Sequence, residues 1–201
     1  QDHLDYHKNM KAYFNAKLLL FKKILGKKKF IVCDKSIKEY SVLKKISRNK
    51  NLRLIDSGII KKKLEKLKNL NFNELQLKNL SLAISAVKLC NIKEKKIFNM
   101  LDKIKDVSGR LELVRIFSNN IKVFVDFAHT PDALLKAIKV IKKQHGENVS
   151  VVFGCGGDRD FSKRPLMAKI ASKNCKKIYI TDDNPRNEKP EYIRKKIIEN
   201  I

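Results

Sequence analysis

A cluster of glycines directly after an apolar run constrains the fold of this chain more than any other feature. Residues 150–153 read Ser-Val-Val-Phe, which favours a strand, and Gly-Cys-Gly-Gly follows at 154–157. Glycines directly after a parallel strand let the backbone turn tightly and approach a ligand. A second apolar run at 177–181 leads into Asp-Asp-Asn-Pro-Arg at 182–186. Ligands of open α/β sheets bind at the carboxyl ends of the strands, so we expect both loops at one edge of one sheet.

Apolar runs alternate with helical segments from residue 109 onward, and this order predicts a Rossmann-like domain with a mostly parallel sheet. Because the pattern changes at Ser108-Gly109, we place a boundary near Val107 and expect two α/β domains, residues 1–106 and 107–201. The stretch 57–70 is rich in lysine and stays ambiguous. The expected strands are 29–33, 52–55, 111–117, 122–126, 150–153 and 177–181. The expected helices are 9–25, 36–46, 75–89, 93–104, 131–143, 164–173 and 190–200.

The formal net charge of +25 suggests a nucleic-acid-binding module as one function class. The excess is almost all lysine, spread along every segment, with no basic face in which aromatic residues are interleaved. We therefore expect no nucleic-acid partner and keep such a module as the alternative from a different class. Where lysine is the default cation, an arginine indicates a need for its planar, bidentate guanidinium group. The arginines within the motifs below are Arg110, Arg159, Arg164 and Arg186.

The cysteines, the first residues and the hydropathy indicate a cytoplasmic protein without a membrane partner. Four cysteines lie far apart with no CxxC pair, so free thiols are expected rather than a zinc or redox site. No apolar stretch reaches ~18 residues, the length of a membrane-spanning helix. The first residues lack the basic and apolar regions of a signal peptide. We expect a monomer.

A lysine interrupts the apolar stripe of the first expected helix. Lys17 lies four residues after Tyr13 and three before Leu20, which puts it on the same helix face. A lone buried ammonium is unfavourable. Two interpretations therefore stay open: a lysine that extends its amine to solvent, or a modified or metal-linked lysine. The expected stripe consists of Met10, Tyr13, Leu20, Phe21 and Ile24.

The sequence Val-Asp-Phe-Ala-His-Thr-Pro-Asp at 125–132 joins an expected strand to an expected helix. Thr130 can cap that helix, and Pro131 suits its first position. His129 then stands beside a helix N-terminus, where anions bind well. A well-capped loop with an incidental histidine is the alternative.

Several segments together resemble the Mur ligase family of ATP-dependent amide-bond ligases. Besides the two loops and the motif at 125–132, the resemblance rests on Asp-His-Leu-Asp-Tyr-His at 2–7 with Lys17, and on Gly109-Arg110. It implies an α/β fold in which the later part of a central ATP-binding domain is followed by most of a Rossmann-like C-terminal domain. The resemblance is strong over 1–25 and 107–190 and thin over 45–75.

The resemblance implies a magnesium site near the start of the chain. In the family, the lysine that matches Lys17 is carbamylated, and the anionic carbamate helps to hold Mg²⁺. The histidine of the family's Asp-His-Leu-Asp, here His3, also reaches a Mg²⁺. His3 and Lys17 are thereby implied as catalytic and metal-binding residues, and a carbamate facing a cation would remove the problem of a buried ammonium. His7 has a weaker case and can be structural.

The resemblance also implies which residues bind ATP. By their places in the family's motifs, Asp126 would hydrogen-bond the ribose, His129 would lie near the nucleotide and Arg110 would contact it. Phe127 stands where the family has a tyrosine, which keeps an aromatic surface and loses a hydroxyl. Asn79 matches a family asparagine near the adenine less closely, and a surface asparagine is the alternative.

In the family, Asp-Asn-Pro-Arg marks the ligases that take meso-diaminopimelate, whereas those that use L-lysine have a different tetrapeptide. The distal end of meso-diaminopimelate is a zwitterion. Arg186 can pair with its carboxylate while Asp183 and Asn184 hold its ammonium. The family's arginine at the position of Arg159 also contacts a diaminopimelate carboxylate. An ordinary Asp/Asn/Pro turn is the alternative.

The resemblance therefore implies a ligase that uses ATP and Mg²⁺ to add meso-diaminopimelate to UDP-MurNAc-L-Ala-D-Glu in peptidoglycan synthesis. A folylpolyglutamate synthetase or an L-lysine-adding ligase is the near alternative, and Asp-Asn-Pro-Arg argues against both. The family's phosphate-binding loop and UDP-sugar domain would precede Gln1, and its Gly-Lys-Gly-His-Glu segment would follow Ile201. We therefore expect little or no ligase activity from these residues alone.

Overall fold

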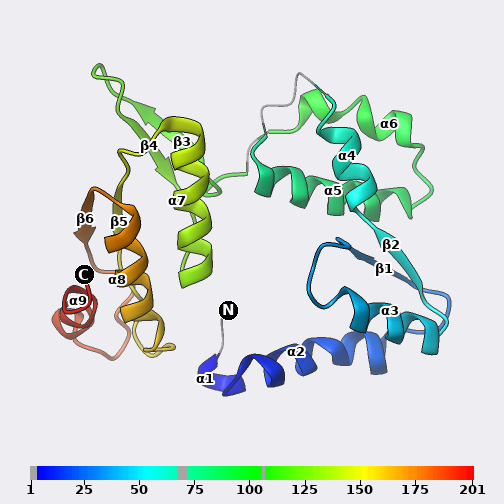
Figure 1. The fold of residues 1–201 in the computed structure, drawn as a ribbon, viewed down its shortest axis with the longest axis horizontal. Helices are drawn as coiled ribbons and strands as arrows, with labels where there is room; N and C mark the ends of the chain where they lie inside the picture. Colours follow the sequence, from blue (N-terminus) through cyan, green and yellow to red (C-terminus); the bar gives the residue numbers. More distant parts are fainter. Residues whose placement is uncertain (1–3, 68–71, 106) are drawn as a thin grey trace. The chain divides into compact units, whose positions relative to one another are not determined.

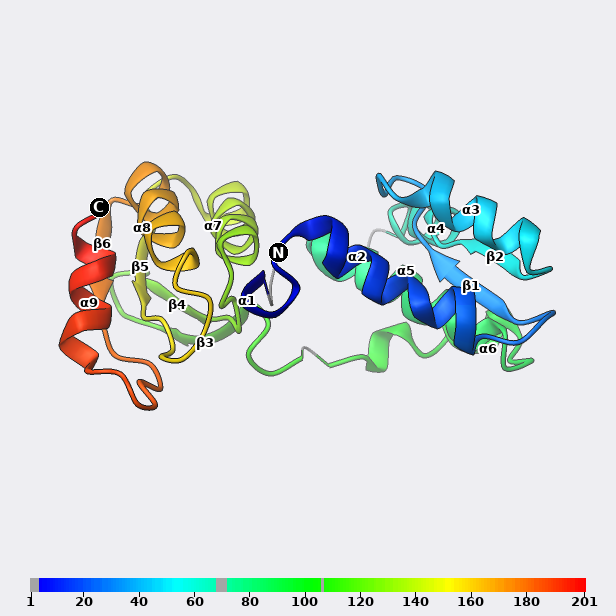
Figure 2. The same cartoon turned by 90° about the horizontal axis from the view of Figure 1, so that it is seen from below.

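The computed structural model shows helices and short strands along the chain, seen from two directions in Figures 1 and 2. Contacts between residues divide it into two units, residues 14–105 and residues 106–201, and group residues 1–13 with the second unit. Each unit has its own core. The residues that the structure describes are 4–67, 72–105 and 107–201, with side chains from residue 6 onward.

The first unit contains most of a long helical segment. α2 (Met10–Leu19) continues directly as η1 (Leu20–Ile24), a π-helical turn in which Leu25 N donates to Leu20 O at 2.8 Å. The segment ends at Ile24, because Leu25 is extended with φ −70° and ψ 121°. The helix thus ends one residue before the expected Leu25.

Two parallel strands, β1 (Phe30–Cys33) and β2 (Arg53–Asp56), are linked by α3 (Tyr40–Asn49). The β-α-β order matches the expectation, but the helix begins later than residue 36. Asp34 Oδ1 accepts a hydrogen bond from Ser36 N at 2.8 Å, and this turn competes with the helix. The buried residues of this part are Leu18, Ile31, Cys33, Leu43, Ile46 and Leu52.

The face of the helical segment that meets this core is not the face that carries Lys17, so most of the expected stripe is wrong, although its member Phe21 does pack against the core. Leu18 is 2% exposed, whereas Lys17 is exposed, and so are Met10, Leu20 and Ile24. A second apolar stripe runs along the same helix, and packing against β1 and α3 selects it. An exposed ammonium has no desolvation cost, so burial gives no reason to infer that Lys17 is modified. The core-facing residues are Phe14, Leu18, Phe21 and Leu25.

Helices form the rest of the first unit. The lysine-rich stretch that stayed ambiguous contains α4 (Gly58–Leu64), which packs against α5 (Glu74–Lys88). Asn73 Oδ1 accepts from Gln76 N at 3.0 Å, and Gln76 Oε1 accepts from Asn73 N at 2.9 Å, a capping box that starts α5. Two short pieces, α6 (Glu94–Phe98) and the 3₁₀ turn η2 (Leu101–Lys103), replace the single helix expected over 93–104.

The second unit begins with an antiparallel hairpin of β3 (Glu112–Ile116) and β4 (Lys122–Val125). This pair departs from the expected mostly parallel sheet. The link between the strands is too short for the crossover that parallel strands need. Phe117 N donates to Ile121 O at 2.9 Å and closes the link as a turn.

From there the unit alternates as expected, and α8 packs against both α7 and α9 (Figure 1). None of the helices in the described ranges is long and apolar enough to cross a bilayer. β5 and β6 are parallel neighbours. The bounds are α7 (Pro131–His145), β5 (Ser150–Phe153), α8 (Lys163–Asn174), β6 (Lys177–Ile180) and α9 (Pro190–Ile198).

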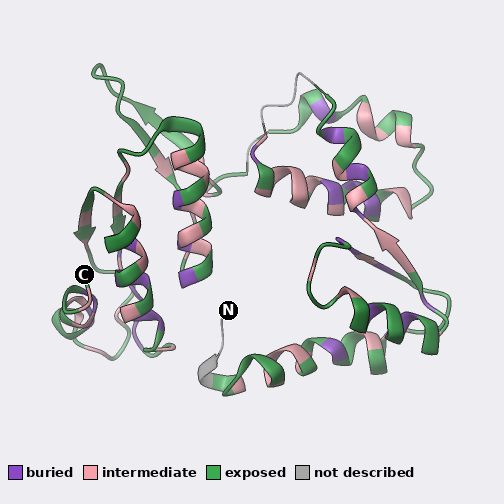
Figure 3. Ribbon diagram, viewed as in Figure 1, coloured by how far each residue is buried: buried purple, intermediate pink, exposed green. Residues whose placement is uncertain are grey.

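One face of the β5–β6 pair carries the core of this unit. Val151, Phe153 and Ile178 pack with buried residues of the helices, whereas Val152 and Tyr179 on the other face are exposed. Figure 3 shows buried positions recurring along α7 and α8. A cavity of about 1030 Å³ lies among β4, α7 and β5. Within the described residues, β4 and β5 are not hydrogen-bonded to each other. The strands therefore form separate pairs instead of one continuous sheet.

Candidate functional site

Two loops follow β5 and β6 and lie side by side: the glycine loop (154–160) and the Asp-Asn-Pro-Arg loop (181–188). Gly157 N donates to Asn184 O at 2.9 Å. A Cβ on Gly157 would lie 1.8 Å from Pro185 O, although Gly157 does not have a positive φ. Glycine is therefore needed here to make room for the neighbouring backbone, and the edge expected to bind a ligand is built from two tightly packed loops.

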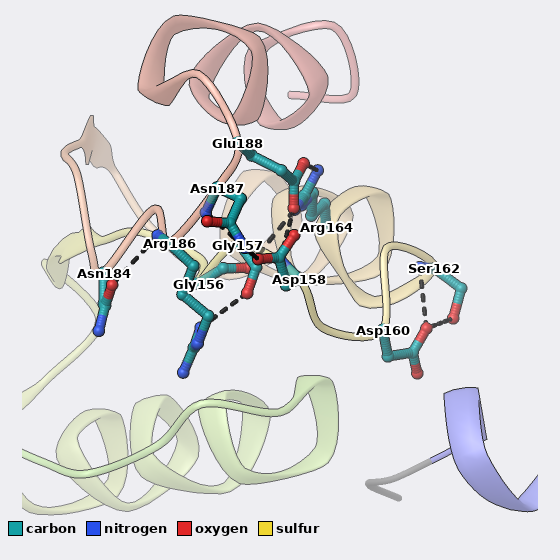
Figure 4. A network of polar contacts seen from close by, with 10 residues as sticks. All are labelled: Gly156, Gly157, Asp158, Asp160, Ser162, Arg164, Asn184, Arg186, Asn187 and Glu188. Carbon is teal, nitrogen blue, oxygen red and sulfur yellow. Dashed lines mark hydrogen bonds and ion pairs between the residues drawn. The ribbon is translucent and has the colours of Figure 1, made fainter.

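A buried ion pair joins the two loops through α8 (Figure 4). Arg164, in the first turn of α8, is 1% exposed, and its Nη1 and Nη2 donate to Oε2 and Oε1 of Glu188 at 3.0 and 2.7 Å. Glu188 Oε1 also accepts a hydrogen bond from Asp158 N at 2.7 Å. The hydrogen bonds from Arg164 hold the pKa of Glu188 below its usual range, so this side chain is ionised at neutral pH.

Asp158 and Asn187 form a second link between the loops. Asp158 Oδ2 accepts hydrogen bonds from Asn187 N at 3.2 Å and from Asn187 Nδ2 at 2.8 Å. Asp158 has a φ of +48°, an unusual conformation for a residue with a side chain. Arg159, an expected diaminopimelate contact, comes next and is exposed, and no residue that the structure describes forms an ion pair with it.

Arg186 is anchored to the glycine loop. Its Nη1 donates to Gly157 O at 2.7 Å, and its backbone N–H donates to Asn184 Oδ1 at 3.1 Å. A guanidinium has five N–H donors, so this contact leaves others for a carboxylate. Asn184 and Asp183, the other expected contacts, are exposed in the same loop, and one bond to the Asn184 amide oxygen is already made within the turn.

Two of the expected ATP-binding residues, Arg110 and His129, contact the ring of Phe127, and a third, Asp126, directly precedes it in the chain. The Arg110 guanidinium carbon lies 5.2 Å from the centre of the Phe127 ring, and the His129 ring meets Phe127 edge-on at 5.5 Å. Asp126 Oδ2 accepts a hydrogen bond from Leu111 N at 2.9 Å. A cation, an aromatic face and a carboxylate thus lie close together, a combination that suits a nucleotide.

The helix after this cluster starts as expected. Thr130 Oγ1 accepts a hydrogen bond from Ala133 N at 3.3 Å, and Pro131 is the first residue of α7. His129 is exposed, and its Nδ1 lies 3.0 Å from Phe127 O, within its own loop. The imidazole therefore stands at the start of α7 with its orientation set locally.

The remaining expected site residues belong neither to the two loops after β5 and β6 nor to the group of residues around Phe127. Asn79 is exposed on α5, which belongs to the first unit, and Lys17 is exposed on α2. His3 lies outside the described residues. The His7 ring contacts Tyr13, with ring centres 5.2 Å apart, which fits a structural role. In the described part of the chain, no group of three or more His, Cys, Asp or Glu residues is placed to hold a metal ion.

Glu188, Asp158 and Asn187 were not among the expected site residues. Their importance comes from contacts between loops that are far apart in the sequence, and their spacing does not reveal it. The available signal was Arg164: an arginine in a lysine-rich chain that, once buried, requires a carboxylate partner.

The sequence of this chain was compared with known protein families, and two family domains match it. The sequence matches the Mur ligase middle domain over residues 1–105 and the Mur ligase, glutamate ligase domain over residues 109–200. The chain belongs to the Mur ligase family. The family resemblance and the α/β fold class expected from the motifs are thereby confirmed.

Relatives of this Mur ligase chain include the UDP-N-acetylmuramoyl-L-alanyl-D-glutamate–2,6-diaminopimelate ligases of Rickettsia typhi and Rickettsia bellii, at 39% and 37% identity. Both alignments cover 100% of this chain and 45% and 46% of the relatives, so the chain spans about half their length. The structure of a ligase of the same name has been solved, and the match covers 100% of this chain and 46% of the solved chain. The TM-score is 0.51 and the sequence identity is 25%.

The solved structure of the folylpolyglutamate synthase of Thermotoga maritima also matches, over 90% of this chain and 47% of the solved chain. The TM-score is 0.61 and the identity 16%, which shows a shared fold.

Proposed function

We propose that residues 1–106 and 107–201 are the later central-domain part and the C-terminal-domain part of a cytoplasmic, ATP-dependent ligase. It adds meso-diaminopimelate to UDP-MurNAc-L-Ala-D-Glu during peptidoglycan synthesis. The observation that carries this proposal is the joined pair of loops, in which Arg186 is anchored on Gly157 O at 2.7 Å. Relatives that bear the name of this ligase and align with the entire chain support it.

The loop pair suits the distal end of diaminopimelate. Arg186 keeps donors for a carboxylate, and Arg159 extends from the adjoining loop as a second cation. Asp183 and Asn184 would hold the ammonium through their side-chain oxygens. L-lysine lacks the distal carboxylate, so a site built around two arginines favours meso-diaminopimelate.

The residues around Phe127 suit the binding of a nucleotide. Arg110 would contact ATP, Asp126 would accept a hydrogen bond from the ribose, and His129 would lie beside the nucleotide at the start of α7. Asn79 of α5 is assigned to the adenine. When bound, ATP supplies the phosphoryl group that activates the glutamate carboxylate for attack by the diaminopimelate amine.

Calorimetric titration of the 201-residue chain tests the amino-acid site. We expect meso-diaminopimelate to bind more tightly than L-lysine. Arg186→Lys keeps the charge and removes the planar fork, so it should lower the affinity for meso-diaminopimelate by about tenfold. Lys189→Arg, at an exposed position beyond the loop, is the matched control and should change nothing. Equal affinity of the wild-type chain for the two amino acids would contradict the proposal.

Lys17, as a carbamate, and His3 are proposed to hold Mg²⁺, which would supply positive charge beside the phosphates. Lys17 is an exposed residue of α2, and its place on the surface is compatible with modification by CO₂. With ¹³C-labelled bicarbonate, Mg²⁺ and ATP present, we expect a carbamate carbon signal that disappears in Lys17→Met. Lys22→Met, at another exposed lysine of the same helical segment, should retain it. A spectrum without this signal in the wild-type chain contradicts the assignment.

We further propose a monomer that binds neither nucleic acid nor membrane. Part of the positive charge is neutralised within the fold; Glu94, for example, pairs with both Lys63 and Lys88. Filter binding of labelled DNA and RNA across a salt series should show no retention near physiological salt. Tight, salt-dependent retention would favour the nucleic-acid-binding alternative instead.

A further inference from the structure

The geometry points to Glu188 as a positioning residue for the amino-acid site. It fastens the Asp-Asn-Pro-Arg loop to the glycine loop and thereby fixes the directions from which Arg186 and Arg159 reach the amino acid. This inference rests on the proposed function, because it assigns those two arginines to diaminopimelate. Glu188 acts through other residues and is not itself assigned a contact with the amino acid.

The Glu188 carboxylate receives three hydrogen bonds from two different segments (Figure 4). Oε1 accepts from Arg164 Nη2 and from Asp158 N, both at 2.7 Å, and Oε2 accepts from Arg164 Nη1 at 3.0 Å. The Glu188 side chain is only 15% exposed, so water competes little for these bonds. A glutamine would offer one acceptor and two donors in the same place, and one of its donors would face Arg164.

One path leads from Glu188 to Arg159. The bond to Glu188 holds the backbone N–H of Asp158, and Asn187 Nδ2 holds its side chain at 2.8 Å. These contacts hold Asp158 at a φ of +48°, a left-handed conformation that aspartate adopts more readily than most other residues with a side chain. Arg159 is the next residue, so the direction in which its side chain leaves the loop is set at Asp158.

The other path leads from Glu188 to Arg186. Glu188 N donates to Pro185 O at 3.0 Å, which closes a turn around Arg186. Arg186 has a φ of +50° in this turn, and its Nη1 donates to Gly157 O at 2.7 Å. Arg164 binds Glu188 at the end of this turn, so the turn that carries Arg186 is fastened to α8, and a selective binding site needs its binding groups held in this way.

A purely stabilising residue and a positioning residue differ in one measurable respect. Loss of a stabilising residue weakens the binding of every ligand together with the fold. Loss of a positioning residue weakens only the ligand that the positioned groups recognise. Meso-diaminopimelate has the distal carboxylate and L-lysine does not, so the ratio of their affinities separates the two roles.

The test uses Glu188→Gln in the 201-residue chain, with Glu191→Gln as the matched control. The Glu191 side chain is 73% exposed, and its nearest cation, Arg194, lies 4.0 Å away. Glu188→Gln leaves Arg164 buried without a counter-ion and can unfold the chain. The double variant Arg164→Met/Glu188→Gln removes that cation and keeps the test valid, because it breaks the same link without burying an unpaired charge.

We expect the affinity for meso-diaminopimelate to fall about tenfold in Glu188→Gln and in the double variant, with L-lysine affected less than about twofold. Glu191→Gln should bind both amino acids as the wild type does. Circular dichroism melting identifies the variants that fold. An equal loss for both amino acids, or an unchanged affinity ratio in a folded double variant, would overturn the positioning role.

Hydrogen exchange at the Asp158 amide separates this inference from the proposed function. A wild-type chain that does not bind meso-diaminopimelate contradicts the proposed function. The exchange rate still reports on the link between the loops, because Asp158 N donates to Glu188. Faster exchange in Glu188→Gln than in Glu191→Gln supports the link, and equal rates in the two variants overturn it.

Discussion

Two helix-borne cations, Lys17 on α2 and Arg164 on α8, lie in opposite surroundings. Arg164 is 1% exposed and makes two hydrogen bonds to Glu188, whereas Lys17 is exposed on α2. A charge stays buried only where a partner of opposite charge and further hydrogen bonds replace its water shell, and an exposed charge needs neither. The elements packed against a helix, more than the helix itself, therefore decide which charge requires a partner.

The largest expected difference is in stability, when Arg164 and Lys17 are each replaced by methionine. Arg164→Met leaves the Glu188 carboxylate without its counter-ion, and we expect the free energy of unfolding to fall by about 4 kcal/mol. Lys17→Met should change it by less than about 0.5 kcal/mol, as at most exposed sites. Urea unfolding followed by circular dichroism measures both values. Similar losses in the two variants would contradict the difference between the surroundings of Arg164 and Lys17.

Glycines of the same two regions give the next contrast. A Cβ at Gly157 would lie 1.8 Å from Pro185 O, a backbone atom, so Gly157→Ala should cost about 3 kcal/mol as the loops separate. Gly26 follows the α2 segment and has nothing within 4 Å of such a Cβ. Gly26→Ala should therefore be neutral or stabilising by about 0.5 kcal/mol. Thermal melting compares the two, and a Gly157→Ala chain as stable as wild type would contradict the loop geometry.

The smallest expected effect is a dependence of stability on pH. Hydrogen bonds from Arg164 lower the folded-state pKa of Glu188, so its ion pair stabilises the fold fully above the unfolded pKa of about 4.3. That contribution is lost as the pH falls through the lower folded value. The free energy of unfolding should therefore fall more steeply below about pH 4 in wild type than in Glu188→Gln. In Lys17→Met the free energy of unfolding should depend on pH as it does in wild type. If wild type and Glu188→Gln show the same dependence, Glu188 does not contribute to the stability in this way.

Local signals predicted the elements that frame the candidate site. Thr130 and Pro131 marked the start of α7, and the strand bounds of β5 match the expected 150–153. Each of these features depends on residues within one turn or one strand, where backbone preferences act directly. The β3–β4 hairpin was missed as an antiparallel pair, because strand direction depends on pairing as well as on the order of apolar runs.

Non-local contacts account for what could not be predicted. The stripe with Lys17 and the stripe with Leu18 are both apolar, and only the packing of α2 on its neighbours distinguishes them. Glu188 lies 24 residues from Arg164 and 30 residues from Asp158 along the chain. No periodicity links such positions, so their hydrogen bonds became visible only once the loops were folded against each other.

The Mur ligase family, the helices and strands of the second unit, and the two loops that carry Arg159 and Arg186 were predictable from the sequence. These properties follow from motifs and from short-range backbone preferences. The tertiary structure alone decided which cation is buried, which carboxylate neutralises it and how closely the two loops approach. The physical reason is that desolvation depends on every atom that packs around a charge, and those atoms come from distant parts of the chain.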